Sequence, residues 1–202
     1  MILRGTEMEN QKGLTLLEIT VATTILVIIS GAVFQMFITH LRAQEVSTNL
    51  MVVSENNQLG LRKMAEELLG TDEEFVNVTF NGNQGSRTLP PLSPAGSAAT
   101  VTVYSSITFK RIISFDFTEK RQVWSEDITF QRNTTTNEIE RIEDGQIRRI
   151  TSYASNVLFY NSPSGGIGII LTTTKGDLTG ARPTGAQIED RIEVYPVNKG
   201  TD

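Results

Sequence analysis

A long uncharged segment near the N-terminus limits what this chain can fold into. Ile19 to Leu41 contains no Asp, Glu, Lys or Arg over about 23 residues. As a helix, that length crosses the roughly 30 Å hydrocarbon core of a bilayer. One carboxylate, Glu18, stands at the start of the segment. A charged side chain there costs free energy, so a carboxylate in this place needs a partner and indicates a functional role.

A basic residue and a glycine precede the segment. Lys12 and Gly13 come directly before Leu14, and Glu18 is the fifth residue after the glycine. This order of basic residue, glycine, apolar run and internal glutamate resembles the N-terminus of type IV pilins and of type II secretion pseudopilins. The resemblance covers about the first 40 residues. Leu14 departs from it mildly, because phenylalanine is most common at that place in the family.

The resemblance implies a processing pathway and a role for each of these residues. A prepilin peptidase would cut between Gly13 and Leu14 and remove residues 1–13 as a leader. The new N-terminal amine, on Leu14, would be methylated. Glu18 would act in assembly, where its carboxylate meets the amine of a neighbouring subunit.

Three other interpretations of the segment compete with this one. A secretory signal peptide would have its apolar region over residues 19–29 and a small-residue cleavage site at residues 30–32. Against it, Glu18 occupies a place where positive charge is normal, and the apolar character continues to Ile38. A plain single-span anchor would leave the spacing between Gly13 and Glu18 to chance. A buried helix of a soluble protein is disfavoured by the uncharged length.

Basic residues around the segment say little about its orientation. Arg4 and Lys12 precede it and Arg42 follows it, which slightly favours a cytoplasmic N-terminus. The family resemblance implies the same orientation, in a single-pass protein of the bacterial inner membrane with a periplasmic C-terminal domain. Translation could start at Met1 or at Met8.

The composition excludes several kinds of chemistry. The chain has 202 residues, a formal net charge of −5 and no cysteine. An acidic chain is a poor candidate for general nucleic-acid binding, which depends on neutralising phosphates. Without cysteine there is no disulfide, thiol nucleophile or zinc–thiolate site. His40 is the only histidine, so a histidine cluster is excluded as well.

The sequence contains no recognisable catalytic pattern. No serine lies in a nucleophile elbow, and the glycines of residues 165–168 precede an expected strand rather than a helix, unlike a phosphate-binding loop. Carboxylates gather where the helix is expected to end, at Glu66, Glu67, Asp72, Glu73 and Glu74. They are interpreted as a solvated acidic surface, with calcium binding as the alternative. We expect no enzymatic activity, no metal and no cofactor.

The helix is expected to continue beyond the membrane segment as an amphipathic helix. Mostly apolar residues recur every three or four positions, which places them in a stripe on one face of a helix. Gly70 is expected to stop the helix. This predicts a transmembrane or filament-core helix over residues 14–41 and an amphipathic part over residues 42–70. The stripe consists of Val46, Leu50, Val53, Asn57, Leu61, Met64 and Leu68.

The remainder, residues 71–202, is predicted to form a β-rich domain of antiparallel strands. Residues 81–98 and 175–187 are so rich in Gly and Pro that irregular loops are expected there. The predicted strands are residues 75–80, 99–104, 107–117, 121–131, 138–143, 146–151, 155–161, 166–174 and 188–195.

Asp144-Gly145 is a strong signal for a two-residue hairpin. This turn pairs Ile142 with Ile147 and Glu140 with Arg149. It also sets Arg141 opposite Arg148, and we expect Glu143 to relieve that repulsion.

One long helix followed by an antiparallel meander is an α+β layout, and the resemblance implies a pilin-like fold in which the helix packs on the sheet. The body is most similar to J-type minor pseudopilins and W-type minor pilins, at residues 61–68, 142–149 and 157–160. This implies a structural subunit near the tip of a type II secretion or type IV pilus-like filament. The implied partners are the prepilin peptidase, other minor and major pilins or pseudopilins, the inner-membrane assembly platform and the membrane, without nucleic acid. The alternative is a membrane-anchored adhesin or DNA-uptake minor pilin, with ligand contacts in residues 81–98 or 175–187.

Overall fold

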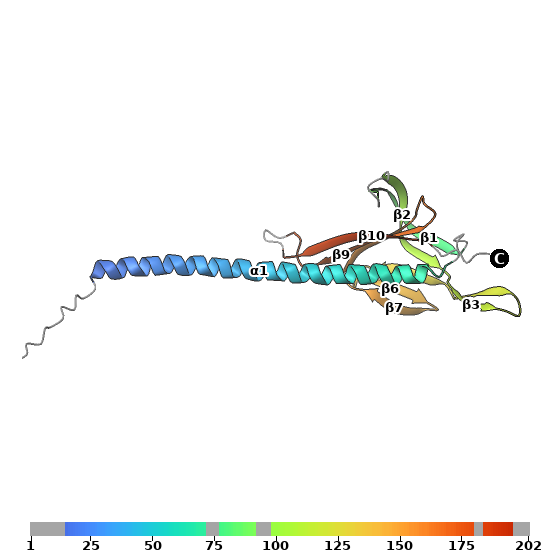
Figure 1. Ribbon diagram of the computed structural model, residues 1–202, viewed down its shortest axis with the longest axis horizontal. Coiled ribbons are helices and arrows are strands. Elements are labelled where there is room, and N and C mark those ends of the chain that lie inside the picture. Colours follow the sequence, from blue (N-terminus) through green and yellow to red (C-terminus); the bar gives the residue numbers. More distant parts are fainter. Residues whose placement is uncertain (1–14, 72–76, 92–97, 180–183, 196–202) are drawn as a thin grey trace, which may run out of the picture. The chain divides into compact units, whose positions relative to one another are not determined.

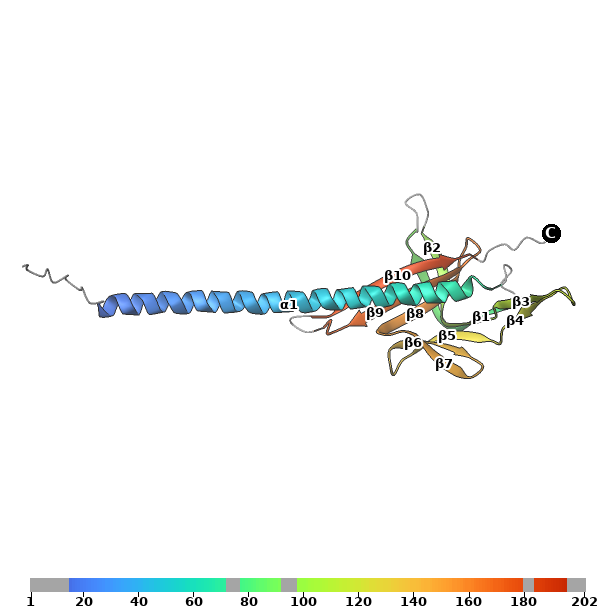
Figure 2. The same ribbon diagram turned by 60° about the horizontal axis from the view of Figure 1, so that its bottom comes forward.

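The computed structural model describes residues 15–71, 77–91, 98–179 and 184–195, which have an α+β architecture (Figures 1 and 2). The chain divides into two compact units, Met1–Gln44 and Glu45–Asp202. The predicted layout, a long N-terminal helix and an antiparallel β-sheet domain, is confirmed.

A single helix, α1 (Leu16–Leu68), forms most of the described part of the first unit and contributes its second half to the second unit. It ends two residues before Gly70, as expected, but not through a left-handed glycine, since Gly70 does not have a positive φ. Instead, the amide and hydroxyl of Thr71 donate to the Leu68 carbonyl at 3.1 and 2.8 Å. These bonds satisfy a carbonyl that the helix end leaves without a partner.

The strands of the second unit form one large sheet and one small one. Eight strands form the large sheet in the order β10-β9-β8-β2-β5-β6-β7, with β1 paired to β2, while β3 and β4 form a separate two-stranded sheet. The strands are β1 (Val78–Leu89), β2 (Ala99–Phe109), β3 (Ile112–Asp116), β4 (Arg121–Trp124), β5 (Ile128–Asn133), β6 (Glu138–Glu143), β7 (Gln146–Thr151), β8 (Ala154–Asn161), β9 (Ile167–Lys175) and β10 (Ala186–Val194).

The sheet is antiparallel as predicted, but it is not a simple meander. Strand β2 pairs with β1 along its length, with β5 over residues 106–109 and with β8 at Tyr104. Because β1 takes one edge of β2 over all of these residues, β5 and β8 must share the other edge. Strand periodicity gives the elements but not their partners, so this fork was not predicted.

The expectation of an irregular loop over residues 81–98 was wrong for its first half. Strand β1 runs to Leu89 through Gly82 and Gly85, whose φ angles are 70° and 93°. The pairing with β2 shifts between Asn83 and Ser86. These glycines therefore form a β-bulge, which needs backbone conformations that other residues rarely adopt.

Two predicted strands are each divided in the structure. Residues 107–117 contain the end of β2 and all of β3, and residues 121–131 contain β4 and most of β5. At the division, the Ser125 amide donates to the Arg111 carbonyl at 2.9 Å, and the Arg111 amide donates to the Ser125 hydroxyl at 3.0 Å. A side-chain acceptor thus interrupts the ladder between the two sheets.

The hairpin between β6 and β7 was predicted correctly. Asp144 and Gly145 both have positive φ, at 50° and 70°, as the turn requires. The register pairs Ile142 with Ile147 and sets Arg141 opposite Arg148.

Arg141 is buried, with 5% of its surface exposed. Its Nη1 lies 2.7 Å from Oε2 of Glu143, on the same strand, and its Nε lies 2.8 Å from Oε1 of Glu67, on α1. The repulsion between Arg141 and Arg148 is therefore relieved by two carboxylates, one of which is on the helix. Glu67 was not predicted as a partner, because nothing local connects it to β6.

The second half of α1 packs on one face of the large sheet. Leu61, Met64 and Leu68 are buried in a cluster with Phe109, Phe130 and other strand residues. The predicted stripe is confirmed from Val53 onward.

The N-terminal end of the stripe was predicted less well. Leu50 is 48% exposed, and the buried residue of that turn is Asn49. The Nδ2 of Asn49 donates to the Thr184 carbonyl at 2.9 Å. Apolarity alone therefore placed the buried face incorrectly at this turn.

A second, smaller core lies on another part of the sheet, formed by Leu89, Val101, Val103, Leu158, Tyr160 and Ile170. Tyr160 and Leu158 alternate along β8 with Val157 and Phe159, which belong to the cluster beneath α1, so the two cores use opposite faces of β8. The Tyr160 ring lies against Gly168, its cross-strand partner.

Replacing Gly168 with alanine is expected to destabilise the second unit by about 1–3 kcal/mol, because the added Cβ would overlap the Tyr160 ring. Chemical unfolding of the detergent-solubilised full chain measures the loss. Gly31→Ala is the control, since a Cβ there meets nothing within 4 Å. Equal stability of the two variants would contradict the packing described.

The Arg141 cluster makes stability depend on pH. A hydrogen bond from Arg141 holds the pKa of Glu143 below its ordinary value of 4.5. The Glu143 carboxylate therefore binds a proton more readily in the unfolded chain than in the folded one. The stability that it contributes to the folded chain is present above about pH 4.5 and is lost as the pH falls through its folded-state pKa.

Urea unfolding between about pH 3 and 7 tests this dependence. Glu143→Gln should lower stability at neutral pH, and its difference from the unchanged chain should shrink on acidification. Glu126→Gln, at an exposed position, is the control. A difference for Glu143→Gln that stays constant with pH would contradict the assignment.

Candidate functional site

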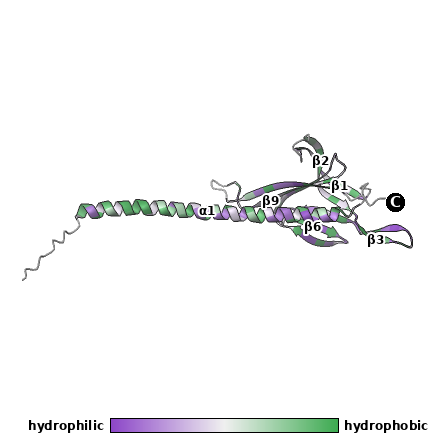
Figure 3. Cartoon of the chain, viewed as in Figure 1, coloured by the Kyte–Doolittle hydropathy of each residue, from purple (hydrophilic) through white to green (hydrophobic). Residues whose placement is uncertain are grey.

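The part of α1 that belongs to the first unit consists mainly of apolar residues (Figure 3). In the described residues 15–44, all are exposed except the half-buried Ile38 and Arg42. Consecutive apolar residues over 25–29 point in all directions around a helix with 3.6 residues per turn. The exposed large apolar residues are Leu16, Leu17, Ile19, Val21, Ile25, Leu26, Val27, Ile28, Ile29, Val33, Phe34, Met36, Phe37 and Leu41. By length and composition this helix could span a membrane.

Threonine hydroxyls on this surface are satisfied within the helix. Thr20 donates to the Leu16 carbonyl at 2.8 Å, and Thr24 donates to the Thr20 carbonyl at 2.8 Å. Thr39, near the other end, donates to its i−4 carbonyl at 2.9 Å. Because an unpaired hydroxyl is costly in an apolar solvent, these bonds suit the helix to lipid or to a bundle of helices.

Glu18 lies in the first turn of α1 and forms a capping box with Thr15. Its Oε2 accepts hydrogen bonds from the Thr15 amide at 2.8 Å and the Thr15 hydroxyl at 3.0 Å. In return, the Glu18 amide donates to the Thr15 hydroxyl at 3.3 Å. Such reciprocal bonds satisfy amides that a helix N-terminus leaves unpaired. Among the described residues, Oε1 of Glu18 accepts no hydrogen bond.

The capping box was missed in the sequence, although its signal is short and local. A Thr followed three residues later by Glu, just before an apolar run, is the usual signature. It gives Glu18 a structural role within its own chain, in addition to any role in assembly. Gly13 and Leu14, the predicted processing site, lie outside the described residues.

The other polar candidates that the structure describes each have a partner within the chain. His40 is exposed, and its Nε2 atom lies 3.1 Å from the Nε2 atom of Gln44. Glu66 pairs with Arg62 at 2.7 Å, and Glu67 belongs to the Arg141 cluster. Asp72, Glu73 and Glu74 lie outside the described residues. Within the described part of the chain, no three His, Cys, Asp or Glu side chains are grouped as metal ligands.

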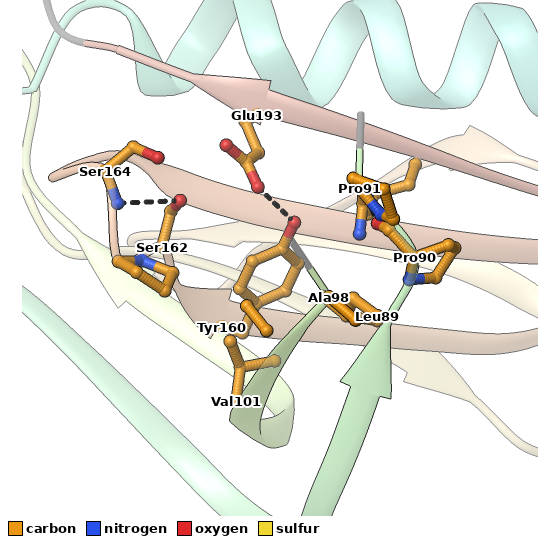
Figure 4. A pocket seen from close by; sticks show the side chains of 12 residues that line it. Leu89, Pro90, Pro91, Ala98, Val101, Tyr160, Ser162, Ser164 and Glu193 are labelled. Atoms are coloured by element: carbon orange, nitrogen blue, oxygen red, sulfur yellow. Dashed lines mark hydrogen bonds between the residues drawn. The ribbon is translucent and has the colours of Figure 1, made fainter. Parts of the chain in front are cut away.

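A cavity of about 330 Å³ opens beside Tyr160 in the second unit (Figure 4). The Tyr160 hydroxyl donates to Oε1 of Glu193 at 2.8 Å, and the Tyr195 hydroxyl donates to Oε2 at 2.6 Å. Arg191 donates to the Pro90 carbonyl at 2.7 Å. The cavity is lined by Leu89, Pro90, Pro91, Ala98, Ala99, Val101, Tyr160, Ser162, Pro163, Ser164, Arg191 and Glu193.

The polar groups of this cavity stabilise one another. Burial, together with its bond to Glu193, raises the pKa of Tyr160. Burial alone would raise the pKa of Glu193, but hydrogen bonds from Tyr195, Tyr160 and Ser162 hold it below the ordinary value. Tyr160 is therefore a neutral donor and Glu193 a charged acceptor at neutral pH. The cavity was not predicted, since its residues come from distant parts of the sequence.

No protein-family model, curated protein or solved structure matches this chain. The exposed apolar helix and the capped Glu18 are therefore the features of the chain that bear on its function.

Loss of the capping box is expected to loosen the first turn of α1. Thr15→Ala should cost about 0.5–2 kcal/mol of local helix stability, because the Glu18 amide loses its acceptor. Amide hydrogen exchange of residues 16–19 in the detergent-solubilised chain should accelerate. Thr23→Ala, which removes only the hydroxyl's bonds to the Ile19 and Thr20 carbonyls, is the control and should leave these amides unchanged. Unaltered exchange in Thr15→Ala would mean that the cap contributes nothing.

Proposed function

We propose that the chain is a structural subunit of a pilus-like filament, of the minor pseudopilin or minor pilin type. One observation carries the proposal: an exposed apolar helix bears a carboxylate in its first turn and leads into a β-sheet domain. Gly13, five residues before Glu18, supports it further. In this role the chain is processed at Gly13, methylated at Leu14 and drawn from the inner membrane into a filament, with its C-terminal unit in the periplasm.

Glu18 is proposed to join one subunit to the next. After cleavage, the amine of Leu14 on a neighbouring subunit would be a cationic partner, and methylation keeps it cationic. The capping box occupies Oε2 and leaves Oε1 for that amine. Opposite charges about 4 Å apart interact by roughly 4 kcal/mol at an effective dielectric near 20. This offsets much of the cost of holding both charges in an apolar bundle, so paired subunits in one register are favoured.

Processing is tested at the N-terminus of the mature protein. Mass spectrometry should find a chain that begins at methylated Leu14. Gly13→Leu should leave the precursor uncut, because by the family resemblance the peptidase needs a small residue there. A mature chain that begins at Val33 would support the signal-peptide interpretation instead.

The role of Glu18 is tested by crosslinking between subunits. Glu18→Ala should be processed and inserted normally, with an unchanged C-terminal unit, but its crosslinking to sibling subunits should drop sharply. Glu18→Gln separates the two roles of the residue, because glutamine also completes a capping box but carries no charge. Crosslinking should be lost in both variants if the charge matters. Recovery in Glu18→Gln would assign the effect to the cap, and full crosslinking in both would favour a plain membrane anchor.

The second candidate is a membrane-anchored binding module, such as an adhesin or a DNA-uptake subunit. The cavity beside Tyr160 favours it, because Leu89, Pro90 and Pro91 belong to the segment that was expected to contact a ligand. Pull-down from the native membrane separates the candidates. A filament subunit should recover sibling pilins, whereas a binding module should recover an external ligand.

A further inference from the structure

The fork in the large sheet leaves a cleft between β5 and β8. Along one edge of β2, pairing with β5 reaches Ser106, and pairing with β8 is found at Tyr104. A cavity of about 360 Å³ lies where the two strands diverge, lined by residues 105–106 of β2, 131–132 of β5 and 156–157 of β8. Small-molecule sites usually have volumes of about 300–1,000 Å³. The fork cleft therefore has room for one small ligand.

Most side chains that line the fork cleft are neutral groups that both donate and accept hydrogen bonds. Gln131 and Asn156 contribute amides, and Ser106 and Thr134 contribute hydroxyls. Within the described part of the chain, none of these four side chains forms a hydrogen bond. All four are exposed or half-buried, so water satisfies them in the free protein. A ligand that displaces this water must offer both donors and acceptors.

Two β-bulges border the fork cleft. One lies in β1 at Gln84, and the other lies in β8 immediately before Asn156. In the first bulge, the Gly82 carbonyl accepts hydrogen bonds from Nε2 of Gln84 and from the Ser105 hydroxyl, each at 3.3 Å. Gln84 and Ser105 both line the cleft. Bulges redirect side chains and are frequent beside functional sites, so they turn polar groups toward the cleft from both sides.

Arg132 is the charged side chain of the cleft. Its Nε donates to the Ala154 carbonyl at 2.8 Å, and its Nη2 donates to Oδ1 of Asn137 at 2.6 Å. The first bond links β5 to β8, which no strand ladder joins. Within the described chain, Nη1 of Arg132 forms no hydrogen bond, so it can donate to a ligand oxygen.

The residues of the fork cleft exclude several kinds of ligand. Among the described residues that line it there is no Asp, Glu or Lys. A cationic ligand would therefore lack a counter-charge, and a hard metal ion would lack the carboxylates that it prefers. No aromatic side chain lines the cleft, and its one large apolar residue, Val157, is 1% exposed. An aromatic or aliphatic ligand would thus find little to pack against.

We propose that the fork cleft binds one saccharide unit. Each hydroxyl of a sugar donates and accepts hydrogen bonds, as do the amides of Gln131 and Asn156 and the hydroxyl of Ser106. Nη1 of Arg132 donates to a sugar hydroxyl, or to the carboxylate of an acidic sugar, where the bond is stronger. The site shares no residue with the cavity beside Tyr160. It also goes beyond the filament role and does not depend on it, because neither Glu18 nor the apolar part of α1 takes part.

Capture on immobilised saccharides tests the proposal with the full chain. The probes are neutral hexosides, N-acetylhexosaminides and uronates, each as monosaccharides and disaccharides. The chain is held in lipid nanodiscs, because the headgroups of glycoside detergents would compete for the cleft. At least one class should capture the chain, and the same free sugar should release it. Capture by neutral sugars would show that hydroxyls suffice, and capture by uronates alone would assign the carboxylate to Arg132. Either result supports the proposal.

Two variants place the captured sugar in the fork cleft. Gln131→Ala and Asn156→Ala should each weaken binding about fivefold or more, because each removes a donor and an acceptor that face the ligand. Their thermal midpoints should match that of the unchanged chain, since neither amide has a partner in the described chain. Gln187→Ala, which removes an exposed amide from β10, is the matched control and should leave the affinity unchanged.

The absence of capture by every class of saccharide would overturn the proposal. Equal affinities in Gln131→Ala, Asn156→Ala and the unchanged chain would also overturn it, because the sugar would then bind elsewhere. If Gln131→Ala does not fold, Asn156→Ala decides alone, since Asn156 is exposed. None of these measurements involves crosslinking or processing, so failure here is distinct from failure of the proposed function.

Discussion

The second unit depends on burying one face of α1, from Asn49 to Leu68, against the large sheet. The chain has no cysteine, so packing rather than disulfides must hold the unit together. The main cluster joins helix residues such as Met64 to strand residues such as Phe109 and Phe130. Removal of apolar surface from water is the main favourable term in folding, at about 25 cal/mol per Å². Without the helix, the apolar face of the sheet would be exposed to water, so the helix is the second layer that a stable domain requires.

Polar groups make this contact specific as well as strong. At the C-terminal end of α1, Glu67 reaches the buried Arg141 of β6, and nearer its middle Asn57 reaches β9 and β10. A buried ion pair or amide often contributes less to stability than an apolar residue of the same size would. Such groups have partners in only one arrangement, however, so they penalise every other docking of the helix. The apolar residues supply the driving force and the polar ones the choice of position.

What could be predicted from the sequence was what depends on neighbours in the sequence. The Asp144-Gly145 turn fixes its register through two adjacent residues with positive φ, so the pairing of β6 and β7 followed from it. The stripe around Met64 followed from helical spacing in the same way. The fork at β2 and the partnership of Arg141 with Glu67 depend on residues far apart in the chain, which no local pattern specifies. The glycines of β1 misled because they indicate a break in some settings and a bulge in others.

Glu18 shows the same difference between interactions with sequence neighbours, which can be predicted, and interactions with distant partners, which cannot. The bonds between Glu18 and Thr15 are local, and their signature stands in the sequence, whereas a partner on another chain leaves no local signature. The two roles are compatible, because the cap occupies Oε2 and the positive end of the helix favours a charged carboxylate there. In apolar surroundings the remaining oxygen gains more from a cationic donor than it would in water, since the effective dielectric is lower. In the proposed filament, the capped carboxylate would be held in place for a neighbour while the single chain retains a satisfied helix start.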